Sequence, residues 1–73
     1  MLVKAVVLVK SPKKLIAARL RMVKSVYDSF AVSGQFDAVA LIEVKELSQI
    51  KDVTTEIHNI KGVERTETLV QVV

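Results

Sequence analysis

Two kinds of hydrophobic pattern alternate along this chain, and their order limits the folds that it can adopt. A valine- and leucine-rich run at 2–9 is followed by helical spacing, two further strand-like segments, a second helical segment and a last strand-like segment. The order β-α-β-β-α-β is that of the ferredoxin-like fold, in which two helices pack on one face of a four-stranded antiparallel sheet. We therefore predict one α+β domain spanning residues 1–73.

The boundaries of the elements follow from local signals. A first helix is predicted over 12–22, with Ser11 as its N-cap and Pro12 at its first position. A second helix is predicted to begin after a cap at Glu46 or Ser48 and to end before Gly62. Its apolar stripe is predicted to consist of Leu47, Ile50, Val53, Ile57 and Ile60. The four strands are predicted at 2–9, 26–32, 37–44 and 63–73.

The predicted strands are apolar on both faces, which is unusual for a sheet that has helices on one face only. Along the first strand, Val7 and Val9 would lie on one face and Val6 and Leu8 on the other. A sheet face in contact with water would instead carry polar residues at alternate positions. The pattern therefore predicts that the helix-free face packs against the sheet of another subunit. Oligomerisation would also stabilise a domain of this size, which buries only about 60% of its unfolded surface and is marginally stable alone.

The composition argues against several other functions. The chain has no cysteine, which excludes disulfides and thiolate metal sites. Its single histidine, His58, is most simply a partly exposed helix residue. Neither a Gly-rich phosphate loop nor a Ser-His-Asp set is evident, so we predict no enzyme activity and no cofactor or metal. No apolar run is long enough to span a membrane, and a cytoplasmic location is expected. The first and third strands lack the aromatic residues of RNA-recognition domains.

Two polar clusters remain as candidate binding elements. The first is the turn "SGQFD", in which Gly34 can adopt positive φ, Phe36 can form an apolar wall and Asp37 can contact an ammonium group. The second is "GVERTETLV", where alternation places Thr66 and Thr68 on the same face of the last strand. From the local pattern alone, a simple hairpin turn is the favoured explanation of the first cluster. For the second cluster, the alternative to a binding role is that threonine simply favours strands.

Together, these two motifs resemble those of the Lrp/AsnC family of transcriptional regulators. The stretches "VSGQFDAVALIEVKEL" and "IHNIKGVERTETLV" are similar to the effector-binding, or RAM, domain of that family. Its signature combines a G-x-[YF]-D turn with a terminal GV-x-x-[TS]-x-T strand, and the resemblance covers the whole chain. Gly34, Phe36 and Asp37 match the turn, and Thr66 and Thr68 match the hydroxyl positions of the strand.

The resemblance implies a non-enzymatic domain that binds an amino acid or a similar small effector. It implies dimers with sheets packed back to back, a dimeric α/β barrel-like assembly, which form octamers or other rings. Effectors would bind between dimers, near the turn and the last strand. Full-length members also carry a helix-turn-helix DNA-binding domain, which is not found in this sequence. Direct DNA binding is therefore not expected, and full-length regulators are possible partners. Two alternatives stay open: a ligand-independent assembly adaptor and an ACT-like regulatory domain.

Overall fold

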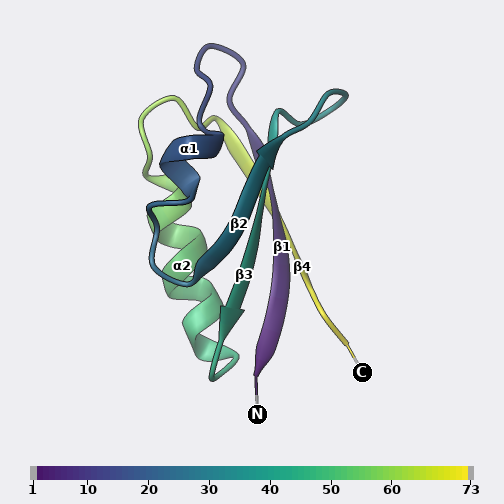
Figure 1. Cartoon of the computed structure of the whole chain (residues 1–73), viewed down its shortest axis with the longest axis vertical. Coiled ribbons are helices and arrows are strands. Elements are labelled where there is room, and N and C mark those ends of the chain that lie inside the picture. Colours follow the sequence, from purple (N-terminus) through teal and green to yellow (C-terminus); the bar gives the residue numbers. More distant parts are fainter. Residues whose placement is uncertain (1, 73) are drawn as a thin grey trace.

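The computed structural model describes residues 2–72 and confirms the predicted order of elements. The order is β1 (Val3–Lys10), α1 (Ala17–Leu20), β2 (Val26–Ala31), β3 (Ala38–Val44), α2 (Ser48–His58) and β4 (Arg65–Val70). Hydrogen bonds join the strands in the order β2-β3-β1-β4, and all three pairings are antiparallel. Both helices lie on the same side of this sheet, and the other side is uncovered (Figure 1). The chain therefore has the predicted βαββαβ fold.

The hydrophobic core lies between the sheet and the two helices. On β1, the helix-facing side chains of Val7 and Val9 are fully buried, while the alternate residues are partly exposed. The helices contribute Leu20 and Ile57, both at 0% exposure, to the same cluster. The core is built almost entirely from aliphatic side chains, as the low aromatic content of the sequence requires.

The first helix is much shorter than the sequence predicts. The prediction of a helix over 12–22 was wrong, because α1 comprises only Ala17–Leu20. Ser11 is buried and does not act as its N-cap. Its backbone N–H donates to Asp37 Oδ2 at 2.8 Å, and its hydroxyl donates to the carbonyl oxygen of Lys14 at 3.0 Å. These bonds hold the residues after β1 in a turn that is attached to the sheet, and the helix starts only after it.

The second helix follows its predicted stripe but not its predicted caps. Ile50, Val53 and Ile57 are buried, as the spacing indicates, whereas Leu47 is 62% exposed. Neither Glu46 nor Ser48 caps the helix with its side chain. Instead, the side-chain oxygen of Gln49 accepts hydrogen bonds from the backbone N–H groups of Lys45 and Glu46, at 3.0 and 2.9 Å. Gln49, in the first turn of the helix, thus holds these two residues, which precede the helix, by hydrogen bonds.

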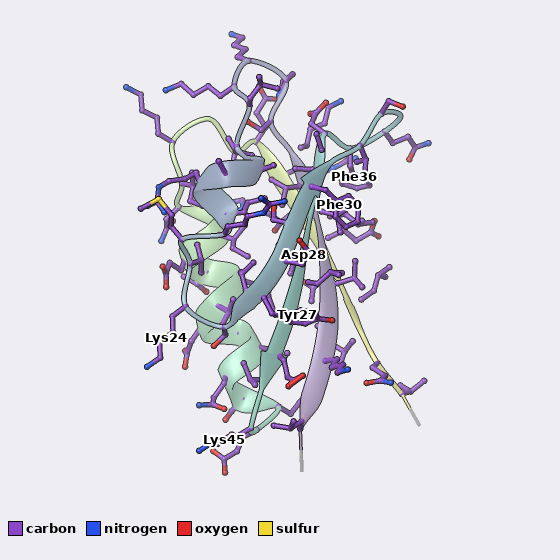
Figure 2. The ribbon with its side chains drawn as sticks, viewed as in Figure 1. Lys24, Tyr27, Asp28, Phe30, Phe36 and Lys45 are labelled. Atoms are coloured by element: carbon purple, nitrogen blue, oxygen red, sulfur yellow. The ribbon has the colours of Figure 1, made fainter. Side chains whose placement is uncertain are left out.

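The strands also depart from their predicted extents. β2 and β3 lie within their predicted ranges, and β1 begins and ends one residue later than predicted. β4 is limited to Arg65–Val70, and Val73, which was predicted to belong to it, lies outside the described residues. In β2, the register with β3 shifts between Val26 and Asp28. This irregularity places Tyr27 on the helix-free side, where it borders a shallow depression (Figure 2).

The helix-free face of the sheet carries apolar side chains that nothing in the described chain covers. Three of these side chains are strongly exposed: Phe30 at 43%, Leu69 at 53% and Tyr27 at 57%. Three more are partly exposed: Val6, Leu8 and Leu41. The depression on this face has a volume of about 360 Å³. We call this surface, made by Val6, Leu8, Tyr27, Phe30, Leu41 and Leu69, the apolar face. It agrees with the two-sided hydrophobic pattern of the strands.

Two leucines in and beside the first helix provide a test of the core. Leu20 is fully buried and Leu15 is 98% exposed. We expect Leu20→Ala to lower the free energy of unfolding by about 2–5 kcal/mol, because it removes buried methyl groups and leaves a cavity. The matched control, Leu15→Ala, should change it by less than about 0.5 kcal/mol. Urea unfolding at one fixed protein concentration measures both, and equal effects would contradict this account of the core.

Candidate functional site

Two segments that are far apart in the sequence meet at the end of β1. The backbone N–H of Asp37, at the end of the β2–β3 hairpin loop, donates to the carbonyl oxygen of Val9 at 2.8 Å. On the other side of β1, the N–H of Glu64 donates to the carbonyl oxygen of Lys10, also at 2.8 Å. The loop and the start of β4 are therefore fixed to consecutive residues of one strand.

A small polar pocket of about 340 Å³ lies between these two segments. The loop contributes Gln35 and Phe36 to its lining, and β4 contributes Arg65, Thr66 and Glu67. The guanidinium carbon of Arg65 lies 5.1 Å from the centroid of the Phe36 ring, within the range of a cation–π interaction. Phe36 points to the side of the sheet away from the helices (Figure 2). We call this site the hairpin–β4 pocket.

Gly34 lies at the exposed tip of the loop, outside the lining of the pocket. Its φ of +120° is a conformation that residues with a side chain rarely adopt. A Cβ atom added there would have no neighbour within 4 Å. The position therefore favours glycine because of its backbone conformation, and not because a side chain would lack space. Gly34 thus shapes the turn that brings Gln35 and Phe36 to the pocket.

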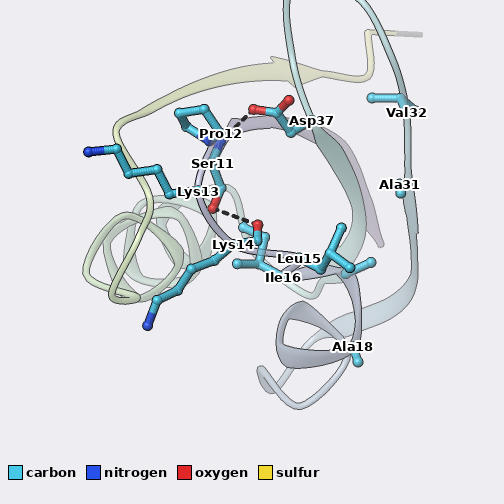
Figure 3. A pocket seen from close by; sticks show the side chains of 11 residues that line it. Ser11, Pro12, Lys13, Lys14, Leu15, Ile16, Ala18, Ala31, Val32 and Asp37 are labelled. Atoms are coloured by element: carbon cyan, nitrogen blue, oxygen red, sulfur yellow. Dashed lines mark hydrogen bonds between the residues drawn. The ribbon is translucent and has the colours of Figure 1, made fainter.

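Asp37 follows Phe36 directly but faces a different cavity. Its carboxylate accepts the Ser11 N–H, and its Oδ2 lies 3.8 Å from Lys10 Nζ. It lines a cavity of about 480 Å³ between the β1–α1 segment and the end of β2, where Figure 3 shows the bond to Ser11. The carboxylate therefore fastens the hairpin to the end of β1.

The register of β4 separates the threonines from their charged neighbours. Thr66 and Thr68 lie opposite Val9 and Val7, whose side chains face the helices, and both threonines are half-buried. Thr66 also borders the hairpin–β4 pocket, whereas Thr68 borders neither cavity. Arg65 and Glu67 lie on the opposite, helix-free side and are exposed.

The structure thus brings together only two of the five residues that the sequence singled out, Phe36 and Thr66. The lining residues that sequence reasoning missed are Gln35, Arg65 and Glu67. The alternation of the last strand does place Arg65 and Glu67 on one face, but it does not show that this face meets the hairpin.

The described residues offer neither a metal site nor a membrane-spanning helix. His58 is exposed on α2. Within residues 2–72, no three His, Asp or Glu side chains are grouped so that they could hold a metal ion. In the same range, no helix is both long and apolar enough to cross a membrane.

The chain is similar to a known protein family and to proteins of known structure. Residues 4–72 match the family model described as the Lrp/AsnC ligand binding domain. A Thermus thermophilus protein of known structure, TTHA0845, is 32% identical, with 97% of this chain and 94% of that chain covered and a TM-score of 0.82. Among curated proteins, no significant sequence match was found.

Two other structures share the fold at low sequence identity. FFRP-DM1 is 19% identical, with 99% of this chain and 100% of that chain covered and a TM-score of 0.80. The transcriptional regulator NMB0573 of Neisseria meningitidis, solved as a complex with L-Met, is 17% identical. In that comparison 97% of this chain and 50% of the regulator are covered, and the TM-score is 0.81.

The attachment of the hairpin by Asp37 can be tested by substitution. We expect Asp37→Ala to lower the free energy of unfolding by about 1–3 kcal/mol, because the buried N–H of Ser11 loses a charged acceptor. Glu56→Ala, at an exposed position of α2, serves as the control and should have little effect. Urea unfolding of the two variants provides the comparison. An Asp37→Ala variant as stable as the parent would mean that this hydrogen bond does not hold the hairpin.

Proposed function

Because the chain belongs to the family of Lrp/AsnC ligand-binding domains, we propose that it binds an amino acid and that this effector controls its assembly. The domains of this family are effector-binding modules of transcriptional regulators. NMB0573, which shares the fold, was solved with L-Met, and this supports an amino acid as the class of ligand.

The single observation that carries this proposal is the position of the hairpin–β4 pocket. Three of its lining residues, Phe36, Arg65 and Glu67, lie on the helix-free side of the sheet, beside the apolar face. A subunit that covers the apolar face therefore approaches the pocket as well. Binding and assembly would share one side of the domain.

We propose that a second copy of the chain covers the apolar face, sheet against sheet. Phe30, Tyr27 and Leu69 are each more than 40% exposed there, and adjacent apolar groups of this kind mark an interaction surface. Two such sheets packed back to back form the dimeric barrel-like assembly expected of this family. Dimers would then associate into octamers or other rings.

The effector would act on this assembly by mass action. We place its site at the hairpin and β4, with Gly34, Phe36, Asp37, Thr66 and Thr68 as the residues that form or support it. Asp37 supports the site by fastening the hairpin, and Gly34 does so by shaping the turn. A ligand that binds the assembled form more tightly shifts the equilibrium towards it. About 1.4 kcal/mol of differential affinity suffices for a tenfold change.

In the cell, such a module would act in the cytoplasm on transcription, through full-length regulators of the same family. The shared fold allows the apolar face of this chain to pair with the corresponding face of a regulator. An amino acid that favours mixed assemblies would then alter the regulator's occupancy of DNA without direct contact between this domain and DNA. A ligand-independent adaptor is the second candidate, because association through the apolar face would not require an effector.

The role of the apolar face can be tested with two exposed leucines. Leu69 lies on that face and Leu47 lies at the start of α2, and they are 53 and 62% exposed. We expect Leu69→Lys to shift the parent chain from oligomer to monomer, because a charge would be buried in the interface. Leu47→Lys should leave the assembly unchanged. Sedimentation velocity over a range of concentrations measures both, and a parent chain that is always monomeric would refute the oligomer.

The effector can be sought by repeating the sedimentation with each of the twenty free L-amino acids. We expect at least one of them to increase the oligomer size or the association constant, and to raise the Tm. An oligomer that responds to none of them, with no shift of Tm, would favour the adaptor. Such an unresponsive oligomer would overturn the proposal that the chain binds an amino acid, but not the proposal that it assembles.

A further inference from the structure

We infer that Arg65 and Glu67 bind the charged groups of the effector, with Arg65 on the carboxylate and Glu67 on the ammonium group. This inference rests on the proposed function and adds to it the recognition chemistry of the site. It predicts that the ligand is a free α-amino acid with both charges present, and not a keto acid, an amine or a blocked derivative.

The first support is the pairing of opposite charges on one face of β4. Arg65 and Glu67 are two residues apart in the strand, so their side chains emerge on the same side, about 7 Å apart along it. Both line the hairpin–β4 pocket. A cation and an anion at this spacing complement a zwitterion placed between them.

The second support is that both charges are available. Within residues 2–72, the ion pairs are Lys10–Asp37 and Arg21–Asp28, and neither Arg65 nor Glu67 takes part in one. The carboxylate of Asp37 is occupied by the Ser11 N–H and lies near Lys10, and it lines a different cavity. Glu67 is thus the carboxylate that faces the hairpin–β4 pocket.

The third support is the orientation of Arg65. Its guanidinium lies over the Phe36 ring, and this contact limits the conformations of a side chain that would otherwise be flexible. When the flat face of a guanidinium packs on an aromatic ring, the N–H groups at its edge remain free. Those N–H groups can donate two parallel hydrogen bonds to a carboxylate. Phe36 would thereby contribute to carboxylate binding through Arg65.

The experiment compares binding of the twenty free L-amino acids by the parent chain, Arg65→Gln and Glu67→Gln, using calorimetry. For each amino acid that binds the parent, the α-amide and the N-acetyl derivative are measured too. We expect each variant to bind about 10- to 100-fold more weakly than the parent, the cost of one charge-assisted hydrogen bond. Arg19→Gln on α1 and Glu56→Gln on α2 are the matched controls and should bind normally.

The derivatives separate direct contact from mere positioning. The α-amide should bind the parent as weakly as the free amino acid binds Arg65→Gln, and Arg65→Gln should no longer distinguish the two. Glu67→Gln should likewise lose the distinction between the free amino acid and its N-acetyl derivative. If both variants bind like the parent, or still discriminate against the derivatives, this assignment is overturned while the proposed function stands. A parent chain that binds none of the twenty amino acids would overturn both.

Discussion

Strand β1 pairs on both sides, and this double pairing organises the rest of the domain. Its antiparallel partners are β3 and β4, so elements from the middle and the end of the chain become neighbours through it. Its alternation also sets the two surfaces of the sheet. Val7 and Val9 belong to the core beneath the helices, while Val6 and Leu8 contribute to the apolar face. One strand thus contributes both to the interior of the subunit and to the surface proposed to contact a second subunit.

The order of elements could be predicted from the sequence because each element has its own periodicity. The strand-like runs and the spacing of Ile50, Val53 and Ile57 are local features, and the structure confirms them. The first helix could not be predicted in the same way. Ser11 and Pro12 form a sound local start signal, but the N–H of Ser11 bonds to a carboxylate 26 residues away. A long-range contact of this kind overrides the local preference for a helix start, and it produces no periodic pattern in the sequence from which it could be predicted.

The sequence predicts the two segments that line the hairpin–β4 pocket, but only two of the five residues in its lining. The motifs around Phe36 and Thr66 mark two segments that the fold does bring together. The sequence also shows that Arg65 and Glu67 share a face opposite to that of the threonines. It does not show which face meets the hairpin, because that depends on the register between β4 and β1. The same register directs the hydroxyl of Thr68 towards the helix side.

The loop tip at Gly34 has a further consequence for how such domains diversify. The loop is anchored where Asp37 bonds to β1, and a Cβ atom at the tip itself would touch nothing within 4 Å. Residues can therefore be inserted at the tip at a small cost in loop-closure entropy, without disturbing the anchor. The length of the loop can therefore vary with little effect on the stability of the scaffold. A biosensor could exploit it by carrying a fluorophore at the tip, next to the pocket and outside the core.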